Sequence, residues 1–532
     1  MAFFMKSIPR TFAAVFIAAA CFLLSGHAAS QMLRIANQGD ILSLDPHSLN
    51  ESLQLNVMAN VYEPLIGRNK DQSLAPLLAS SWRQVSTTVW SFELRKNVQF
   101  HDGKPLTPED VIFSFARAAG ESSDMKSNTL EIKEVRKAGD NAVDIETKYP
   151  FPTLPDSITE LLIVNRKWSE ENEAVLPVDR RTGTENTASF RANGTGPYRV
   201  RERQPNVRTV FFRNATYWGK IEGNAQEIVF QPIADPLTRV NALLAGEVDV
   251  VEPVPVADIP RINSSTVARA VAGPELRTIF LGMDQKRNEL LYSNVKGKNP
   301  FKDKRVRQAF YQAIDIAGIQ RTVMRGASHP TALLIGPGIN GWSADQDKRL
   351  PYDPEASRKL LAEAGYANNF EVTLNCPNDR YVNDWQICEA VAANLGKVGV
   401  KVNLAIESKR TYFPKVLRRD TSFYMLGWTP GTYDAHDALD ALTGCPDAAG
   451  SGLSNLGAYC NPKLDALVRL VRSESDRSRR DALLKEALAL QVEDIGTIPM
   501  HQQALAWGVS KKVELTQMPD DAMPFKWMSI KR

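Results

Sequence analysis

Four cysteines in the second half of the chain have the spacing that most directly suggests chemistry: Cys376, Cys388, Cys445 and Cys460. Cysteines grouped in this way either form disulfides or bind zinc. Neither close pair is a C-x-x-C, and no histidine lies at a suitable spacing nearby. Disulfides are therefore favoured in an exported chain, and Cys376 with Cys388 and Cys445 with Cys460 is the most economical of the three pairings that four cysteines allow.

The sequence contains no motif for nucleophilic, zinc-dependent or nucleotide-dependent catalysis. It has no G-x-S-x-G, no H-E-x-x-H and no G-x-x-x-x-G-K-[S/T]. Its 61 acidic residues include neighbours by chance, so paired carboxylates leave an exported hydrolase open as an alternative. We expect no enzyme, no resident metal and no cofactor, and any ATP hydrolysis belongs to a partner.

The first thirty residues are typical of a secretory signal peptide. Lys6 and Arg10 precede an apolar run over 11–24, and small residues follow as far as Ser30. The run is shorter than the roughly twenty residues of a membrane span. We therefore expect cleavage after Ser30 and a soluble periplasmic protein. Cys21 leaves a lipoprotein signal as an alternative, although the usual leucine does not precede it.

Charge and length narrow the range of partners. Loss of the two basic residues of the leader takes the formal net charge from +3 to +1, which gives no argument for nucleic acid or an anionic membrane as partner. With 532 residues, 43% of them hydrophobic and 23% charged, the chain is long enough for two or more subdomains. The partner is expected to be a small solute or a protein.

Alternating strand and helix patterns must position these residues. Trp90, Phe92 and Leu94 alternate with polar residues, which predicts a half-buried strand. Thr107 followed by Pro108 predicts a helix start after a turn. The same signals predict helices that begin at Pro354 and Pro462 and strands that include 372–374 and 402–406. The chain is therefore mixed α/β, without an internal repeat.

Several segments spread over nearly the whole chain resemble the periplasmic peptide-binding proteins that serve ABC importers, solute-binding protein family 5. This family includes dipeptide-, oligopeptide- and nickel-binding members. The longest similar segment runs from Trp90 to Phe115. Four shorter ones are Asn193-Gly-Thr-Gly-Pro-Tyr-Arg199, Leu244-Ala-Gly-Glu-Val-Asp249, Asp303-Lys-Arg-Val-Arg-Gln-Ala-Phe310 and Tyr459-Cys-Asn-Pro-Lys-Leu-Asp-Ala466.

The resemblance implies a two-lobed α/β fold of the Venus flytrap type, cluster C, with an extra subdomain. Such lobes close on a ligand by hinge motion and carry out no reaction. We expect the segments 31–64, 190–285 and 505–532 to form lobe I, 65–189 the extra subdomain, and 286–504 lobe II.

A peptide zwitterion that leaves water needs partners for both charges, because an unpaired buried charge costs several kcal/mol. Arg380 follows a predicted strand and stands where dipeptide-binding relatives keep their carboxylate-binding arginine, if a one-residue gap is allowed. Its planar guanidinium suits bidentate pairing with a carboxylate. We therefore expect Arg380 to hold the ligand carboxylate; a solvated surface arginine is the alternative.

The loop Gly427–Asp437 resembles the family loop that presents an aspartate to the peptide amine. This chain departs from the pattern, because Pro430 and Gly431 stand where dipeptide-binding relatives have the aspartate. Asp434 can take that role only if the loop is rearranged. The aromatic residues of the loop suit pocket walls, with core packing as the alternative. We expect ligand contacts from Trp428, Thr429, Gly431, Tyr433 and Asp434.

Two further candidates come from the same resemblance. His436 lies in a segment similar to the loop in which nickel-binding relatives place a histidine ligand, although the other histidines form no ligand spacing with it. Ser48, Leu49 and Asn50 lie in a segment similar to the first family loop that enters the cleft, and a helix entry after Asn50 is the alternative.

The sequence therefore predicts a monomeric solute-binding protein that captures a short peptide, or a peptide-like solute, between two lobes and delivers it to the permease of an ABC transporter. A nickel- or metal-chelate-binding protein of the same family is the main alternative. A chaperone or a sensor-feeding protein with the same cleft is a third hypothesis, and the sequence does not distinguish it.

Overall fold

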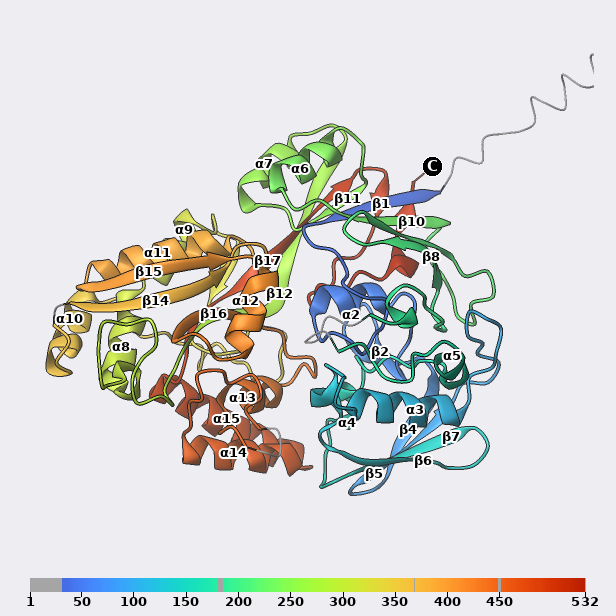
Figure 1. The fold of residues 1–532 in the computed structure, drawn as a ribbon, viewed down its shortest axis with the longest axis horizontal. Helices are drawn as coiled ribbons and strands as arrows, with labels where there is room; N and C mark the ends of the chain where they lie inside the picture. Colours follow the sequence, from blue (N-terminus) through green and yellow to red (C-terminus); the bar gives the residue numbers. More distant parts are fainter. Residues whose placement is uncertain (1–30, 180–184, 368, 448–450, 532) are drawn as a thin grey trace, which may run out of the picture.

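The computed structural model describes residues 31–179, 185–367, 369–447 and 451–531. The chain forms two lobes joined by two long antiparallel strands, β12 (Ala268–Met283) and β17 (Ile498–Ser510) (Figure 1). The predicted signal peptide lies outside the described residues. No helix in the described segments has the length and apolar character needed to cross a membrane.

One eleven-stranded sheet runs through both lobes, in the order β15-β14-β16-β12-β17-β11-β1-β10-β9-β8, with β13 beside β17. Strands β12 and β17 occupy its middle positions. The other strands are β1 (Met32–Asn37), β8 (Tyr198–Gln204), β9 (Arg208–Arg213), β10 (Glu227–Pro232), β11 (Val250–Glu252), β13 (Ser328–Pro330), β14 (Phe370–Pro377), β15 (Val400–Glu407) and β16 (Phe423–Trp428).

Lobe I contains the part of this sheet from β11 to β8, in which β1 lies parallel to both β10 and β11. Its apolar core includes Phe211, Phe230 and Trp507. Short elements surround the sheet: α2 (Ser52–Met58), η2 (Thr187–Ser189), α6 (Pro236–Leu244), η3 (Val256–Asp258), α7 (Ile259–Asn263), β18 (Val513–Glu514), η5 (Phe525–Trp527) and β19 (Ser529–Ile530).

Lobe II is built on β14, β15 and β16, which are parallel to one another where they pair. A cluster of aromatic rings, among them Phe301, Phe310 and Phe423, fills one of its two apolar cores. Its helices are η4 (Pro300–Lys302), α8 (Lys304–Ala313), α9 (Ile316–Thr322), α10 (Pro354–Glu363), α11 (Asp384–Gly396), α12 (Lys409–Leu417), α13 (Ala435–Thr443), α14 (Pro462–Ser473) and α15 (Arg477–Asp494).

The extra subdomain extends lobe I with a separate four-stranded sheet, in the order β4-β5-β7-β6 (Figure 1). It has its own apolar core. The lobe boundaries given above stay a prediction. The elements are β2 (Ile66–Arg68), β3 (Leu74–Pro76), β4 (Ala79–Ser86), β5 (Val89–Leu94), α3 (Pro108–Ala119), η1 (Lys126–Thr129), β6 (Ile132–Lys137), β7 (Ala142–Thr147), α4 (Leu154–Ser157) and α5 (Arg166–Glu171).

The local patterns of the sequence correspond to these elements. Phe92 and Leu94 are buried on β5, as their alternation predicts. Helix α3 begins at Pro108, and the Thr107 backbone N–H donates to Asp110 Oδ2 at 2.9 Å, which is one of the two bonds of a capping box. The helices predicted to begin at Pro354 and at Pro462, and the strands predicted around them, are also confirmed.

The two shared strands lose their regular pairing where they pass between the lobes. Pro274 is opposite Ala504, but Thr278 is opposite Gln502, so three residues of β12 face the single Gln503. Such a bulge bends a strand and redirects its side chains. The irregularity lies in the ladder that runs from one lobe to the other, which is shifted again between Ile279 and Phe280, and we take this region as the hinge.

Both predicted disulfides are present. Cys376–Cys388 joins β14 to α11, and Cys445–Cys460 joins the segment after α13 to the residue before the Asn461 cap of α14. The first encloses the loop that carries Arg380, because the two cysteines lie on either side of it. The second lies outside that loop.

We predict that the two disulfides differ in what they hold. The C376A/C388A and C445A/C460A variants should each lose about 3 kcal/mol of unfolding free energy, the loop-entropy value for loops of this size. Only C376A/C388A should also speed hydrogen exchange in residues 377–383. Equal exchange in both variants would show that the first disulfide does not order the Arg380 loop.

Candidate functional site

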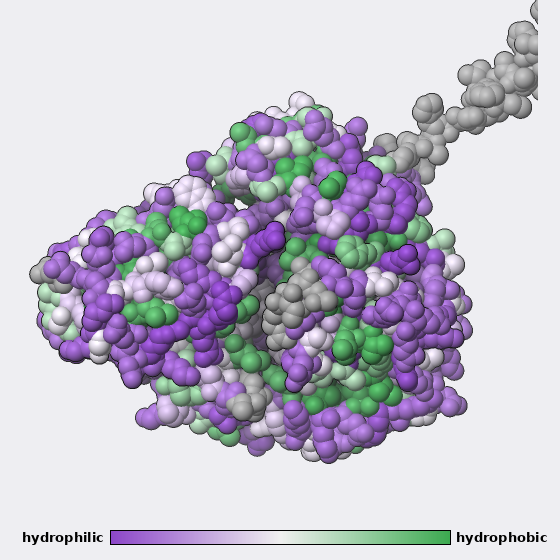
Figure 2. All heavy atoms as spheres, viewed as in Figure 1, coloured by the Kyte–Doolittle hydropathy of each residue, from purple (hydrophilic) through white to green (hydrophobic). Residues whose placement is uncertain are grey.

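A cavity of about 40 Å³ lies between the two lobes, beside the hinge. A cavity needs about 10–15 Å³ to hold one water, so this one has room for only a few waters. The lobes are thus closed on each other, and Figure 2 shows a furrow at their boundary. The lining residues are Asn37, Gln38, Glu51, Leu53, Glu252, Pro253, Glu275, Arg380, Val382, Lys409, Gln503, Leu505 and Asp521.

Parallel strands bring these residues together. Asn37 ends β1 and Glu252 ends the neighbouring parallel strand β11 in lobe I, while Arg380 follows the end of β14 in lobe II. The carboxyl ends of parallel strands form the usual ligand-binding edge of an open α/β sheet. Two such edges, one from each lobe, therefore face the same cavity.

Arg380 lies in this cavity, with 14% of its side chain exposed and Nη2 at 3.3 Å from Glu51 Oε1 across the lobes. Gln38 Nε2 donates to the Arg380 carbonyl at 3.4 Å. Its loop is held by Asp384, whose carboxylate accepts from the backbone N–H of Arg380 at 3.0 Å. Burial raises the pKa of Asp384 to about 6. The structure thus places Arg380 at the cleft, and ligand binding by Arg380 stays a prediction.

The hinge bulge supplies a buried ion pair to the cavity wall. Glu275 and Arg277 are 1% and 3% exposed, and Arg277 Nε donates to Glu275 Oε1 at 2.7 Å. Gln503 Nε2 donates to the other carboxylate oxygen. Residues two apart on a strand point to the same face, so Glu275 and Arg277 lie close enough to pair within the bulged segment. The negative charge of Glu275 is compensated within the protein.

A second pair of carboxyl groups lies on the lobe I wall. Burial raises the pKa of Glu252 to about 7, and the nearby Glu275 adds to this shift while a hydrogen bond with Asp521 opposes it. Burial also raises the pKa of Asp521 well above its usual range, and the Glu252 carboxyl adds to that shift. Two carboxyls in contact cannot both ionise without a strong repulsion, so they share a proton. Sequence reasoning missed both groups, because no motif marks a carboxylate that becomes buried only when distant segments meet.

The residues Ser48, Leu49 and Asn50 lie just outside the cavity lining. Ser48 Oγ donates to the Asp45 carbonyl at 2.9 Å, and the exposed Asn50 contacts the extra subdomain through Asp124. The helix entry that was the alternative is observed, with Glu51 as the N-cap of α2. The cavity residue from this segment is Glu51, one position after the candidates.

The loop after β16 contacts the extra subdomain beside the cavity rather than lining it. Trp428 Nε1 donates to Asp437 Oδ1 at 2.7 Å, and burial raises the pKa of Asp437 to about 7. A Cβ added to Gly431 would lie 3.2 Å from Glu160 of the extra subdomain. Thr429 Oγ1 is shielded from solvent and has no hydrogen-bond partner among the described residues. Ligand contacts from this loop stay a prediction.

Tyr433 links this loop of lobe II to the other half of the molecule. Its hydroxyl donates to Asp520 Oδ2 at 2.7 Å, and the Arg68 guanidinium lies 3.9 Å from its ring centroid. The backbone φ of Tyr433 is 57°, a costly value for a bulky residue. Strained residues persist where their surroundings hold them, which is consistent with a contact that fastens the closed lobes.

Asp434 and His436 are both committed to the interior of lobe II. The Asp434 carboxylate accepts from Arg480 Nη1 and Nη2 at 2.6 and 2.7 Å and caps α13 through the His436 N–H. Burial lowers the pKa of His436 to about 4. The described residues contain no group of three or more His, Cys, Asp or Glu side chains that could hold a metal. Roles for both residues in ligand binding stay predictions.

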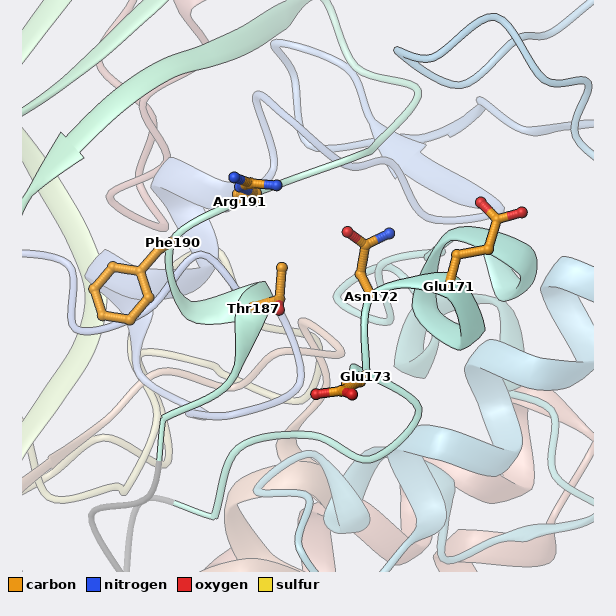
Figure 3. Close-up of a pocket in the computed structure, with 6 residues that line it drawn as sticks. All are labelled: Glu171, Asn172, Glu173, Thr187, Phe190 and Arg191. Atoms are coloured by element: carbon orange, nitrogen blue, oxygen red, sulfur yellow. The ribbon is translucent and has the colours of Figure 1, made fainter.

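A second hollow, of about 440 Å³, lies at the edge of the extra subdomain (Figure 3). Its side chains come from the end of α5 and from around η2, and Glu171 and Glu173 point in different directions. They do not converge on one point as the groups of the interlobe cavity do. The lining residues are Glu171, Asn172, Glu173, Thr187, Phe190 and Arg191.

Two lobes, a shared pair of hinge strands and a charged cavity between them define a protein that binds a solute by closing over it. Comparison with known families agrees. The family described as bacterial extracellular solute-binding proteins, family 5 Middle, matches residues 73–450. The chain therefore belongs to this family of binding proteins.

Individual relatives share the fold over most of their length. The chain is 28% identical over 457 residues to the dipeptide-binding protein of Escherichia coli strain K12, covering 81% of this chain and 79% of that one. It is 26% identical over 491 residues to heme-binding protein A of Haemophilus influenzae, covering 86% and 85%. The periplasmic binding protein DppA of Helicobacter pylori, solved with the peptide STSA, superposes with a TM-score of 0.83 at 19% identity, covering 94% and 98%.

We predict that Glu252 makes the protein less stable as the pH rises. The folded state keeps a proton on Glu252 up to about pH 7, whereas the unfolded chain releases it near the ordinary value of 4.5. The stability gained on Glu252→Gln should therefore grow from pH 4.5 to 7, by up to about 3 kcal/mol, and then level off. Urea unfolding at several pH values measures it. Glu247→Gln, at an exposed site, is the control and should give a pH-independent difference.

We predict that Tyr433 favours the closed form. Tyr433→Phe removes the hydrogen bond to Asp520 but keeps the ring under Arg68, which should weaken closure by about 1.5–3 kcal/mol, the usual range for a bond to a charged group. Small-angle scattering should show a larger radius of gyration. Tyr292→Phe, which also loses a bond to a carboxylate, at 2.6 Å and within lobe II, should leave it unchanged. Identical scattering from wild type and Tyr433→Phe would refute the role.

Proposed function

We propose that the chain captures a short peptide, or a peptide-like solute, between its lobes and releases it chemically unchanged to the permease of an ABC importer. Arg380 carries the proposal, because it presents a guanidinium from lobe II to a cavity at the hinge. The relatives that are named for dipeptide binding, or solved with a peptide, support the same class of solute. Export by a cleaved signal peptide and a monomeric state are parts of this proposal.

The Glu51 carboxylate occupies the place on Arg380 that a ligand carboxylate would take. Its Oε1 lies 3.3 Å from the guanidinium, and the two groups belong to different lobes. A peptide carboxylate would displace Glu51, and the closing lobes would then exclude water from the new ion pair. Because charge-assisted hydrogen bonds strengthen when water is excluded, closure and binding support each other.

When the two lobes close over a bound ligand, the protein takes a shape that a partner can recognise. The lobes move about β12 and β17 while the rest of each lobe keeps its own core. A partner that prefers the closed form is thereby biased toward the loaded protein, and the preference can be no larger than the difference in affinity for the two shapes. The energy for transport comes from the importer in this proposal.

We predict that Arg380→Ala lowers the affinity for dipeptides with a free C-terminus by about 100-fold, the loss expected when one partner of a buried charge pair is removed. Dipeptide amides, which lack the carboxylate, should bind the variant and the wild type alike. Glu51→Gln should bind free dipeptides more tightly than wild type, because it removes the competing carboxylate. Calorimetry with a dipeptide identified by native mass spectrometry measures all three.

Arg358→Ala is the matched control, since Arg358 is 43% exposed on α10. It should bind as wild type does. Unchanged affinity in Arg380→Ala would remove the carboxylate role. Failure of the wild type to retain any peptide would contradict the peptide class, and recovery of cleaved peptide would contradict a binding protein.

A further inference from the structure

The lobe I wall of the cavity carries two neighbouring carboxyl groups that form no ion pair with a basic side chain of the described residues. Glu252 is 4% exposed at the end of β11, and Asp521 faces it from the C-terminal segment. Asp521 Oδ1 is shielded from solvent, and no donor of the described residues bonds to it. Within the described segments neither carboxyl forms an ion pair with an arginine or lysine. Buried carboxylates normally have such partners.

The other two acidic groups of the cavity are already paired. Glu275 is compensated by Arg277 at 2.7 Å, and Glu51 by Arg380 at 3.3 Å. Lys409 belongs to lobe II and extends toward Gly39 of lobe I. A Cβ added to Gly39 would lie 2.7 Å from the Lys409 Nζ. The cavity is therefore polarised, with Arg380 and Lys409 on lobe II and, on lobe I, a carboxyl pair that Arg239 and Arg277 influence without forming an ion pair with it.

The loop that the sequence favoured for amine recognition offers no free carboxylate at Asp434. Arg480 and Asn340 both bond to this carboxylate, Asn340 at 2.8 Å, and the His436 N–H bonds to it as well. The two positions at which the sequence comparison expects the aspartate are Pro430 and Gly431 in this chain, and neither carries a charge. A cationic group of a ligand in the cavity therefore needs a different carboxylate.

We propose that Glu252 and Asp521 form a subsite for the cationic group of the ligand, an ammonium or a guanidinium. This inference rests on the proposed function. The ligand lies across the cavity, with its cation on lobe I and its carboxylate on Arg380 of lobe II. Each charged end then belongs to a different lobe, so a solute with only one of the two charges cannot draw both lobes together.

The subsite also couples binding to proton release. The charged groups that face the pair are Glu275 and Arg277 from β12, Arg239 from α6 and Lys409 from α12, with Glu51 and Arg380 on the opposite wall. A bound cation favours ionisation of both carboxyls and therefore expels the proton that they share. Binding at pH 7 should therefore be accompanied by release of protons.

The test compares wild type with Glu252→Gln, Asp521→Asn and the double variant E252Q/D521N. A pool of unmodified dipeptides and the same pool after N-acetylation are offered to each, and native mass spectrometry identifies what is retained. The double variant should bind the leading unmodified dipeptide at least about 30-fold more weakly than wild type. Calorimetry in two buffers of different ionisation enthalpy should show proton release in wild type and none in E252Q/D521N.

The variants should fold, because replacing a buried carboxyl by its amide removes repulsion and keeps the shape. Glu247→Gln, on the exposed surface, is the control and should behave as wild type. Retained N-acetylated peptides should all contain lysine, arginine or histidine.

Two results overturn the inference alone: tight binding of N-acetylated peptides without a cationic side chain, or full affinity in E252Q/D521N. Failure of wild type to retain a peptide from either pool overturns the proposed function, and the subsite with it.

Discussion

The pair of strands shared by both lobes constrains the rest of this molecule. A sheet that runs through both lobes must keep its hydrogen bonds when the lobes move, so the movement has to be concentrated where the ladder is already irregular. That place is the bulge in which three residues of β12 face Gln503. The same bulge places Glu275, which is paired with Arg277, in the wall of the cavity. The proposed hinge and one wall of the cavity are therefore built from one irregularity, so a movement about it would reorganise the charges of the cavity.

Charge distribution across the cavity gives the closed form its character. Two polar contacts join the lobes: Arg380 with Glu51, and Tyr433 with Asp520. Polar contacts of this kind contribute little when exposed and more when water is excluded. Closure therefore depends in part on how well the charges in the cleft are matched, which a ligand can change.

In the proposed subsite, stability and function oppose each other at the Glu252 and Asp521 pair. Burying two neighbouring carboxyls costs free energy, and the raised pKa of Glu252 expresses that cost. Glu275 and Glu51 show that the chain can compensate acidic groups in this cavity with arginines. Among the described residues that line the cavity, the carboxyls without an ion-pair partner therefore all lie on one wall. A local cost of this kind is found at functional sites.

The sequence by itself determined the local elements and the class of fold. Alternation on β5, the capping residues of α3 and the short cysteine spacings depend on neighbours within a few residues, and motifs spread along the chain indicated the two-lobed family. The sequence also placed Arg380 at the end of a strand facing the cleft.

Only the tertiary structure decided which charges meet. Glu51, Glu252, Glu275 and Asp521 come from four distant segments, and nothing local distinguishes them from other acidic residues. Likewise Asp434 appears in the sequence as a free aspartate of a cleft loop, whereas folding places it against Arg480, 46 residues later. Desolvation and long-range pairing depend on the packed structure, so they cannot be read from the order of residues alone.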